Sequence, residues 1–230
     1  MPEKPKAWLA WSSGKDSAWS LHVMRQRGEI EVVALLTTVN QKYQRVAMHA
    51  VRESLLDAQA AAAGLPLVKV EIPSPCPNEI YERAMAEAMA RARADGITHV
   101  VFGDLFLEDI RRYREEDLAK CAMTPVFPLW LKPTRELAKE MIAGGLRAHL
   151  TCVNPRKLDG RFAGRAFDAQ LLAELPPSVD PCGENGEFHT CVVAGPMFAS
   201  PIAVEAGGIV TRDGFVFADF LPRTAQAVPR

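Results

Sequence analysis

Short apolar runs alternate with helical segments through the first half of the chain, and this alternation constrains the fold more than any other feature. We expect buried strands at residues 6–11, 30–37, 67–72 and 98–102. We expect the intervening helices at residues 17–28, 45–63 and 79–95, with a further helix beginning near Glu108. Strands that alternate with helices connect into right-handed βαβ units. The first half is therefore predicted to be a parallel sheet covered by helices on both faces.

The pattern changes after about Trp130, where the strict alternation ends. We expect helices at 134–143 and 167–174 and strands at 147–153, 191–194, 202–205 and 215–220. The pairs Gly207-Gly208 and Asp213-Gly214 are typical of turns. The predicted organisation is a nucleotide-binding domain at 1–132 and a smaller α+β domain at 133–230.

Composition excludes several classes of protein. Lys and Arg total 27 against 28 Asp and Glu, so there is no strong nucleic-acid signal. The five cysteines contain no C-x-x-C pair, which argues against a disulfide framework or a zinc ribbon. The N-terminus is too poor in apolar residues for a signal peptide or a membrane span, so we expect a cytoplasmic protein that does not bind membranes.

The segment Ser-Ser-Gly-Lys-Asp-Ser, residues 12–17, joins the first predicted strand to the first predicted helix. Backbone N–H groups at the start of a helix favour an anion such as phosphate. The hydroxyls of Ser12, Ser13 and Ser17 add donors, and Gly14 lets the backbone approach closely. We therefore predict a phosphate site at the crevice where parallel strands end.

Lys15 and Asp16 extend this prediction to a polyphosphate with a metal ion. Lys15 supplies a positive charge. Asp16 suits Mg²⁺, which is commonly held between a carboxylate and substrate phosphates. The simpler alternative is a Ser/Gly helix cap with solvated charges, since the first glycine of the longer G-x-x-x-x-G-K-[ST] loop is missing.

Three other stretches are candidates for the same crevice. Gly103-Asp104 follows the fourth predicted strand, so Asp104 would project into this crevice, or it could cap the following helix. Arg111, Arg112 and Arg114 could neutralise phosphate, or form a solvated helix face with the neighbouring acids. His49 could reach the adenine or ribose, or could be an ordinary surface residue.

The Gly-rich segment at 183–190 carries a second group of candidates, Glu184, Glu187, His189 and Thr190. Carboxylates this close repel one another unless a cation is near. Such a loop could hold a cationic group or accept a proton during a reaction. The alternative is an exposed acidic turn.

Taken together, these motifs resemble those of the diphthine-ammonia ligase family of PP-loop ATP pyrophosphatases. Residues 12–17 resemble the PP-loop S-G-G-x-D-S, with Ser13 in place of its first glycine. The other matching motifs are R-V-A-M-H-A-V-R at 45–52, V-F-G-D-L at 101–105, R-R-Y-R-E-E at 111–116, P-L-W at 128–130 and G-E-N-G-E-F-H-T at 183–190. The resemblance extends from about Lys6 to residue 220, nearly the whole chain.

The resemblance implies a Rossmann-like (HUP-type) α/β nucleotide-binding domain with a smaller C-terminal domain, and an ATP-dependent carbon–nitrogen ligase. Its cofactors would be ATP and Mg²⁺. Such enzymes adenylate a carboxylate, release pyrophosphate and transfer ammonia. In diphthamide synthesis the acceptor is diphthine on elongation factor 2, and in a bacterium it would be another carboxylate, such as a small metabolite. The resemblance also implies nucleotide or acceptor contacts at Gly103-Asp104. It places the 183–190 loop near the acceptor, where the loop could hold the amine of the substrate, orient ammonia or deprotonate it during attack.

Two other functions remain open at this point. One is tRNA thiolation, which usually calls for paired cysteines and a basic face that this chain lacks. The other is an ATP-sensing module without turnover, which would not need the acidic 183–190 loop. The sequence is equally compatible with a homodimer formed through the late strands and with a monomer.

Overall fold

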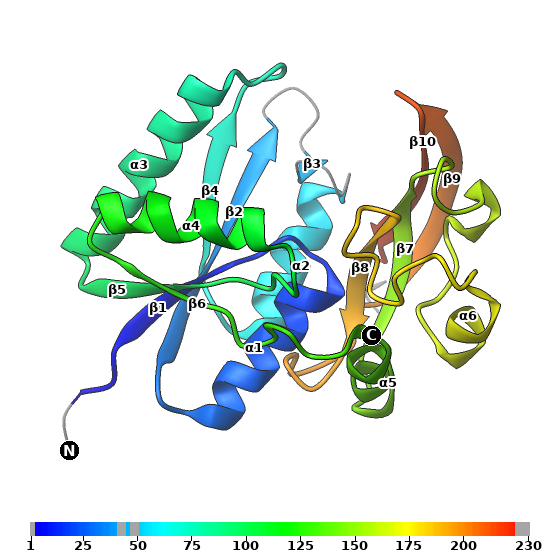
Figure 1. Ribbon diagram of the computed structural model, residues 1–230, viewed down its shortest axis with the longest axis horizontal. Helices are drawn as coiled ribbons and strands as arrows, with labels where there is room; N and C mark the ends of the chain where they lie inside the picture. Colours follow the sequence, from blue (N-terminus) through cyan, green and yellow to red (C-terminus); the bar gives the residue numbers. More distant parts are fainter. Residues whose placement is uncertain (1–2, 41–44, 47–50, 224–230) are drawn as a thin grey trace, which may run out of the picture.

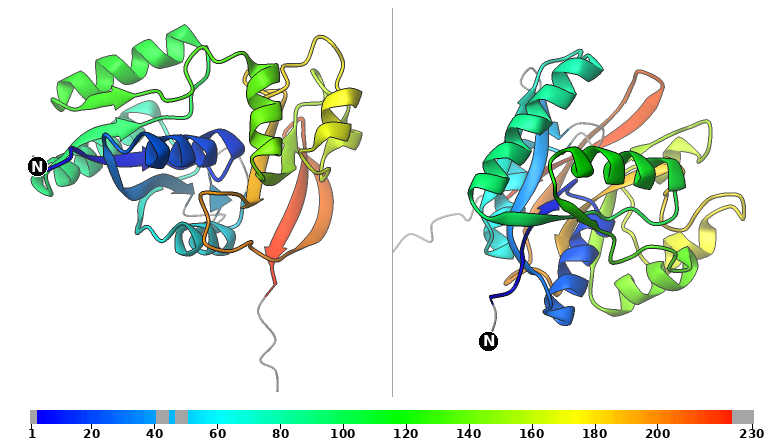
Figure 2. Two further views of the ribbon diagram at one scale, coloured as in Figure 1. Left: turned by 90° about the horizontal axis from the view of Figure 1, so that it is seen from below. Right: turned by 60° about the vertical axis from the view of Figure 1, so that its left-hand side comes forward.

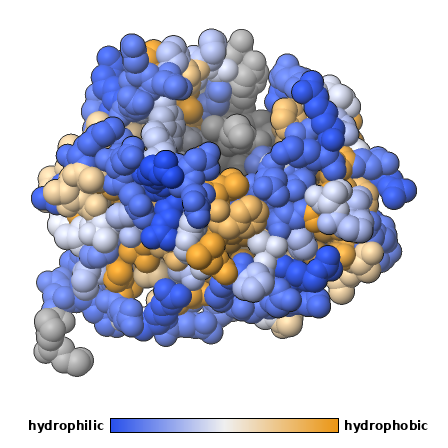
Figure 3. Space-filling model, viewed as in Figure 1, coloured by the Kyte–Doolittle hydropathy of each residue, from blue (hydrophilic) through white to orange (hydrophobic). Residues whose placement is uncertain are grey.

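The protein folds into two sheets that lie side by side and are flanked by helices (Figure 1). The structure is a computed structural model that describes residues 3–40, 45–46 and 51–223, with only the backbone given at 45–46. Within these residues, no helix is both long enough and apolar enough to cross a membrane. The face shown in Figure 3 is mostly hydrophilic, with hydrophobic residues gathered near its centre.

The first sheet has the parallel order β4-β2-β1-β5-β6. Its strands are β1 (Lys6–Ala10), β2 (Glu31–Asn40), β4 (Leu67–Ile72), β5 (Ile97–Val101) and β6 (Thr124–Val126). A short strand, β3 (Arg45–Val46), pairs antiparallel with the end of β2. The strand order reverses direction between β1 and β5, so the loops after these two strands diverge and leave a crevice.

Helices cover both faces of this sheet. Successive residues of its strands point to opposite faces, and apolar side chains lie on both. Leu9 and Leu35 pack with α1 (Lys15–Arg27) and α2 (Glu53–Ala63). Trp8 and Leu36 face the other way, toward α3 (Asn78–Ala94) and α4 (Glu108–Lys120). Burial of both faces is the usual reason for continuous apolar runs in parallel strands. The predicted Rossmann-like α/β fold is thus confirmed.

The second sheet is antiparallel, with the order β8-β7-β10-β9. Its strands are β7 (Arg147–Val153), β8 (Phe188–Ala194), β9 (Val204–Arg212) and β10 (Phe215–Pro222). The segments around it include α5 (Thr134–Ala143), the 3₁₀ helix η1 (Gly160–Phe162) and α6 (Ala169–Glu174). Figure 2 shows the helices of the first sheet on its two faces and the second sheet to one side.

One hydrophobic core continues across the junction of the two sheets. Leu21 of α1, Leu137 and Met141 of α5, and Leu150 of β7 belong to the same buried cluster. The predicted boundary between residues 132 and 133 lies between β6 and α5. We propose this boundary as a division of the sequence. The hydrophobic core is continuous across it.

The structure corrects several predicted elements. The helix expected over 45–63 begins only at Glu53, and Arg45–Val46 is a strand. Gly207-Gly208 does not form a turn but lies inside β9, where a Cβ on Gly207 would lie 3.1 Å from the Cβ of Asp219. Gly207 therefore allows β9 and β10 to lie close together, and the chain does not reverse direction there. The turn at Asp213-Gly214 is confirmed, since it joins β9 to β10.

Candidate active site

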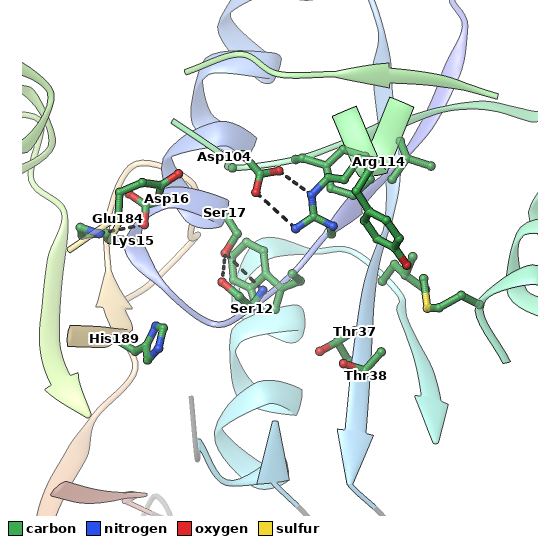
Figure 4. Close-up of a pocket in the computed structure, with 18 of the residues that line it drawn as sticks. Ser12, Lys15, Asp16, Ser17, Thr37, Thr38, Asp104, Arg114, Glu184 and His189 are labelled. Atoms are coloured by element: carbon green, nitrogen blue, oxygen red, sulfur yellow. Dashed lines mark hydrogen bonds and ion pairs between the residues drawn. The ribbon is translucent and has the colours of Figure 1, made fainter. Parts of the chain in front are cut away.

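A pocket of about 460 Å³ opens at the carboxyl ends of β1, β2 and β5. This volume lies in the range of small-molecule sites. Figure 4 shows its arrangement, with Lys15, Asp16 and Glu184 at one end, Ser12 and Ser17 in the middle, and Thr37 and Thr38 at the other end. Both halves of the chain contribute to the walls: the loops after β1, β2 and β5 belong to the first sheet, and Glu184 lies in the segment that leads into β8 of the second sheet.

The segment at 12–17 forms a tight loop that ends in the first turn of α1. The first helical hydrogen bond runs from Ala18 N to Gly14 O, at 3.1 Å, so the preceding N–H groups lie outside the helical ladder. Gly14 is the N-cap and has no side-chain cap bond. Ser12 Oγ and Ser17 Oγ lie 3.2 Å apart beside these groups. Ser17 Oγ donates to Gly14 O at 3.0 Å, and Lys15 N–H donates to Thr190 Oγ1. The donors that the loop can offer an anion are therefore the Ser12 hydroxyl and other N–H groups at the start of α1.

Gly103 lets the end of β5 touch this loop. A Cβ at Gly103 would lie 2.9 Å from both the carbonyl carbon of Asp16 and the backbone nitrogen of Ser17. Real Cβ atoms do not approach so closely, so only glycine permits this contact without a shift. The backbone at Gly103 therefore packs directly against the first turn of α1, at the base of the crevice.

Lys15 is buried, with 2% of its surface exposed, and it is already paired. Its Nζ donates to Asp16 Oδ2 at 2.8 Å and to the backbone oxygen of Cys182. The rings of Phe167 and Phe188 lie 5.7 and 5.6 Å from the same nitrogen. Burial lowers the pKa of Lys15, but the Asp16 carboxylate and other acidic neighbours outweigh it and hold that pKa above its usual value. Lys15 is therefore positively charged, and in this structure its charge is paired with the Asp16 carboxylate.

Asp16 has one oxygen left for another partner. Burial raises the pKa of Asp16, and the adjacent Lys15 ammonium opposes that rise. Its Oδ2 accepts from Lys15, whereas Oδ1 is buried without a hydrogen-bond partner among the described residues. The described part of the chain contains no cluster of three or more His, Cys, Asp or Glu that could hold a metal ion by itself. One free carboxylate oxygen fits Mg²⁺, which takes most of its remaining ligands from phosphates and water.

Glu184 brings a second carboxylate to the same end of the pocket. Its Oε1 accepts from Leu105 N at 2.8 Å, and its own backbone N–H donates to Asp180 Oδ2 at 2.9 Å. Burial raises the pKa of Glu184 to about 7, and the nearby charge of Asp16 adds to the rise. A carboxyl group poised near neutral pH can accept or release a proton during a reaction.

The other candidates in the 183–190 loop are placed differently. His189 lines the pocket, and burial lowers its pKa to about 4, so it is neutral at physiological pH. Thr190 Oγ1 accepts from Lys15 N at 3.1 Å. Glu187 is buried but is absent from the pocket wall; its Oε1 accepts from Asp180 N and Asn185 Nδ2, at 3.1 and 3.2 Å. Glu187 thus contacts its own loop rather than the cavity.

Asp104 does not cap the following helix, whose N-cap is Leu107. Instead its two oxygens accept from Arg114 Nε and Nη2, at 2.6 and 3.2 Å, at the pocket wall. The Arg114 guanidinium also lies 4.4 Å from the centre of the Phe102 ring. Arg111 and Arg112 are absent from this wall, and Arg111 pairs with Glu115 instead. Of the three arginines, only Arg114 belongs to the pocket.

Sequence reasoning missed the apolar end of the pocket. Side chains from β4, α3, β5 and α4 form this end, namely Ile72, Tyr81, Met85, Met89, Val100, Phe102 and Leu118. Thr37 and Thr38 of β2 adjoin it, and the buried Thr37 Oγ1 has no hydrogen-bond partner among the described residues. Thr37 could have been predicted from the sequence, because it lies near the carboxyl end of β2, the strand that pairs with β1. His49 and the flanking residues 47–50 lie outside the described residues.

The comparisons with known proteins agree with this architecture. The family model described as the diphthamide synthase N-terminal domain matches residues 5–121, and the diphthamide synthase C-terminal domain matches residues 133–216. The chain is 27% identical to the diphthine–ammonia ligase of Bos taurus and 26% identical to that of Homo sapiens. Both alignments cover 90% of this chain and 85% of the relative. The chain therefore belongs to the diphthamide synthase family.

Proposed function

We propose that this protein is an ATP-dependent ligase that adenylates a carboxylate and then converts it to an amide with ammonia. The observation that carries the proposal is the meeting, in one pocket, of the Ser12–Ser17 loop with the Glu184 carboxylate from the other half of the chain. A nucleotide site alone would not need the second group. The names of the relatives, which give diphthine and ammonia as substrates, agree with this reading.

The geometry suggests an orientation for ATP. The apolar end of the pocket would take the adenine base, with the Thr37 hydroxyl, which has no partner among the described residues, as a polar contact. The Ser12 hydroxyl and N–H groups at the start of α1 would bind the β and γ phosphates. Asp16 would hold Mg²⁺ through Oδ1, and the bound ion would neutralise phosphate charge.

The reaction then needs two bond exchanges. The acceptor carboxylate oxygen bonds to the α phosphorus while the bond from that phosphorus to the bridging oxygen breaks, releasing pyrophosphate. Ammonia next attacks the acyl carbon, the carbon–oxygen bond to AMP breaks, and one proton passes from nitrogen to the Glu184 carboxylate. Positioning of the reactants supplies much of the acceleration, since no covalent enzyme intermediate is required.

The acceptor we propose is diphthine, which the names of the relatives give as a substrate, and the family resemblance places this group on elongation factor 2. A small carboxylate metabolite is the alternative acceptor for the same chemistry. Incubation with α-labelled ATP, ammonium and each acceptor in turn distinguishes them. The proposal predicts AMP, pyrophosphate and an amide in equal amounts with one acceptor. ADP as the labelled product would overturn the adenylation step, and tight ATP binding without turnover on any acceptor would favour a sensor.

A further inference from the structure

The helix α2 carries a fully buried glutamine that contacts the phosphate loop and the second sheet at once. Gln59 has no exposed surface. Its Nε2 donates to Ser13 O at 3.1 Å and to Val192 O at 2.7 Å, while its Oε1 accepts from Trp11 Nε1 at 2.9 Å. A buried amide with both ends bonded is costly to replace, because each lost bond leaves a buried polar group unpaired.

The loop residue that Gln59 contacts has an unfavourable backbone conformation. Ser13 has φ = 70°, in the left-handed region that favours glycine. Such a conformation persists only when the surrounding contacts hold it. The contacts here are two hydrogen bonds to the Ser13 carbonyl, from Gln59 Nε2 at 3.1 Å and from Val192 N at 2.9 Å.

The strand β8 makes a second contact with the loop, at Lys15. Thr190 Oγ1 accepts a hydrogen bond, at 3.1 Å, from the backbone nitrogen of Lys15, which lies two residues after Ser13. The bonds from Thr190 and Val192 place Ser13 and Lys15 against one strand of the second sheet. Gln59 ties that strand and the loop together, since it donates to a carbonyl of each.

We infer that Gln59 is a positioning residue that fixes the shape of the phosphate loop by tying it to β8. This inference rests on the proposed function, since it assumes that the loop binds the phosphates of ATP. Gln59 is absent from the pocket wall, so it acts through the residues it bonds, Trp11, Ser13 and Val192. The phosphate site is therefore complete only when the second sheet is docked against the first.

The test compares two ligands that share the nucleoside but differ in phosphates. Gln59→Met keeps the length of the side chain without its amide. We expect this variant to bind adenosine with an affinity within twofold of the wild type and ATP·Mg²⁺ at least tenfold more weakly, measured by calorimetry. General destabilisation would not separate the two ligands. Equal affinities for ATP in variant and wild type, or parallel losses for ATP and adenosine, would overturn the inference.

Two further variants keep the experiment decisive. Leu171→Ala removes a fully buried side chain in α6, a helix that supplies no pocket residue, and serves as a control for lost stability. If Gln59→Met does not fold, Gln59→Glu retains the acceptor for Trp11 and loses at least one donated bond, and the same weakening of ATP relative to adenosine is expected. The wild type separates this inference from the proposed function. If the wild type binds ATP no better than adenosine, the proposed phosphate site itself is wrong.

Discussion

At the scale of single residues, Asp16 has the most consequential environment in the pocket. One of its oxygens is bonded to Lys15 and the other is buried without a partner among the described side chains. Asp16→Asn keeps the shape but removes the charge that would pair with Lys15 and hold Mg²⁺. We expect AMP formation to fall at least a hundredfold, measured with labelled ATP. Asp57→Asn, at a half-exposed position in α2, is the control and should keep the wild-type rate.

Glu184 is expected to set the pH dependence of the amide-forming step. A general base works when ionised, and burial raises the pKa of Glu184 to about 7. At a fixed concentration of free ammonia, the rate of amide formation should therefore rise as pH increases through about 7 and then level off. Glu184→Gln should lower that rate by about 10²-fold or more and abolish this rise.

The matched control for this prediction is Glu174→Gln, at the end of α6 outside the pocket. This variant should keep the wild-type rate and pH profile. A Glu184→Gln enzyme with the wild-type profile would show that another group accepts the proton.

Many residues of the candidate site could be named from sequence, but their partners could not. The loop at 12–17 and Asp104 were found because they follow predicted strands, and the structure places Ser12, Asp16 and Asp104 on the pocket wall. Sequence gave no sign that Lys15 bonds to the Cys182 carbonyl or that Asp104 bonds to Arg114, because these contacts depend on packing between distant segments.

At the scale of elements, the contact between β5 and α1 holds the two loops of the crevice together. Gly103→Ala would place a Cβ 2.9 Å from Asp16 and Ser17 backbone atoms. Overpacking of this kind typically costs about 1–3 kcal/mol. We expect the free energy of unfolding to fall by that amount and the KM for ATP to rise, because the start of α1 is displaced.

Gly208→Ala is the matched control, because it makes the same glycine-to-alanine change at a position where the added Cβ has room. A Cβ at this position in β9 meets no atom within 4 Å. Denaturant unfolding and steady-state kinetics should give values near the wild type. If Gly103→Ala behaved in the same way, the close contact between β5 and α1 would have no role in the site.

Element prediction succeeded where burial leaves a periodic pattern. The strands β1, β2, β4 and β5 are rich in apolar residues because both faces of the sheet are covered. The strand β6 was missed because three residues are too short for a pattern. The exposed β9 lacks apolar alternation, and its Gly207-Gly208 pair indicated a turn, although the strand continues through it. Strand pairing, rather than local sequence, determines these two elements.

At the scale of the whole molecule, the shared core predicts that the two sheets unfold together. Met141 of α5 is fully buried in the cluster that also contains Leu21 of α1. Met141→Ala should lower the free energy of unfolding by about 2–5 kcal/mol. All four tryptophans lie within residues 8–130, so their fluorescence monitors mainly the first half. Fluorescence and far-ultraviolet circular dichroism should shift together in this variant, and separate transitions would indicate independent domains.

The central claim is that ATP activates a carboxylate before ammonia reacts. Exchange of labelled pyrophosphate into ATP, measured without ammonium, tests it most directly because the exchange requires a reversible adenylation step. We predict exchange that depends on the acceptor carboxylate, persists in Glu184→Gln and is lost in Asp16→Asn. Amide formation by the wild type with no carboxylate-dependent exchange, and with ADP and phosphate as products, would contradict the account.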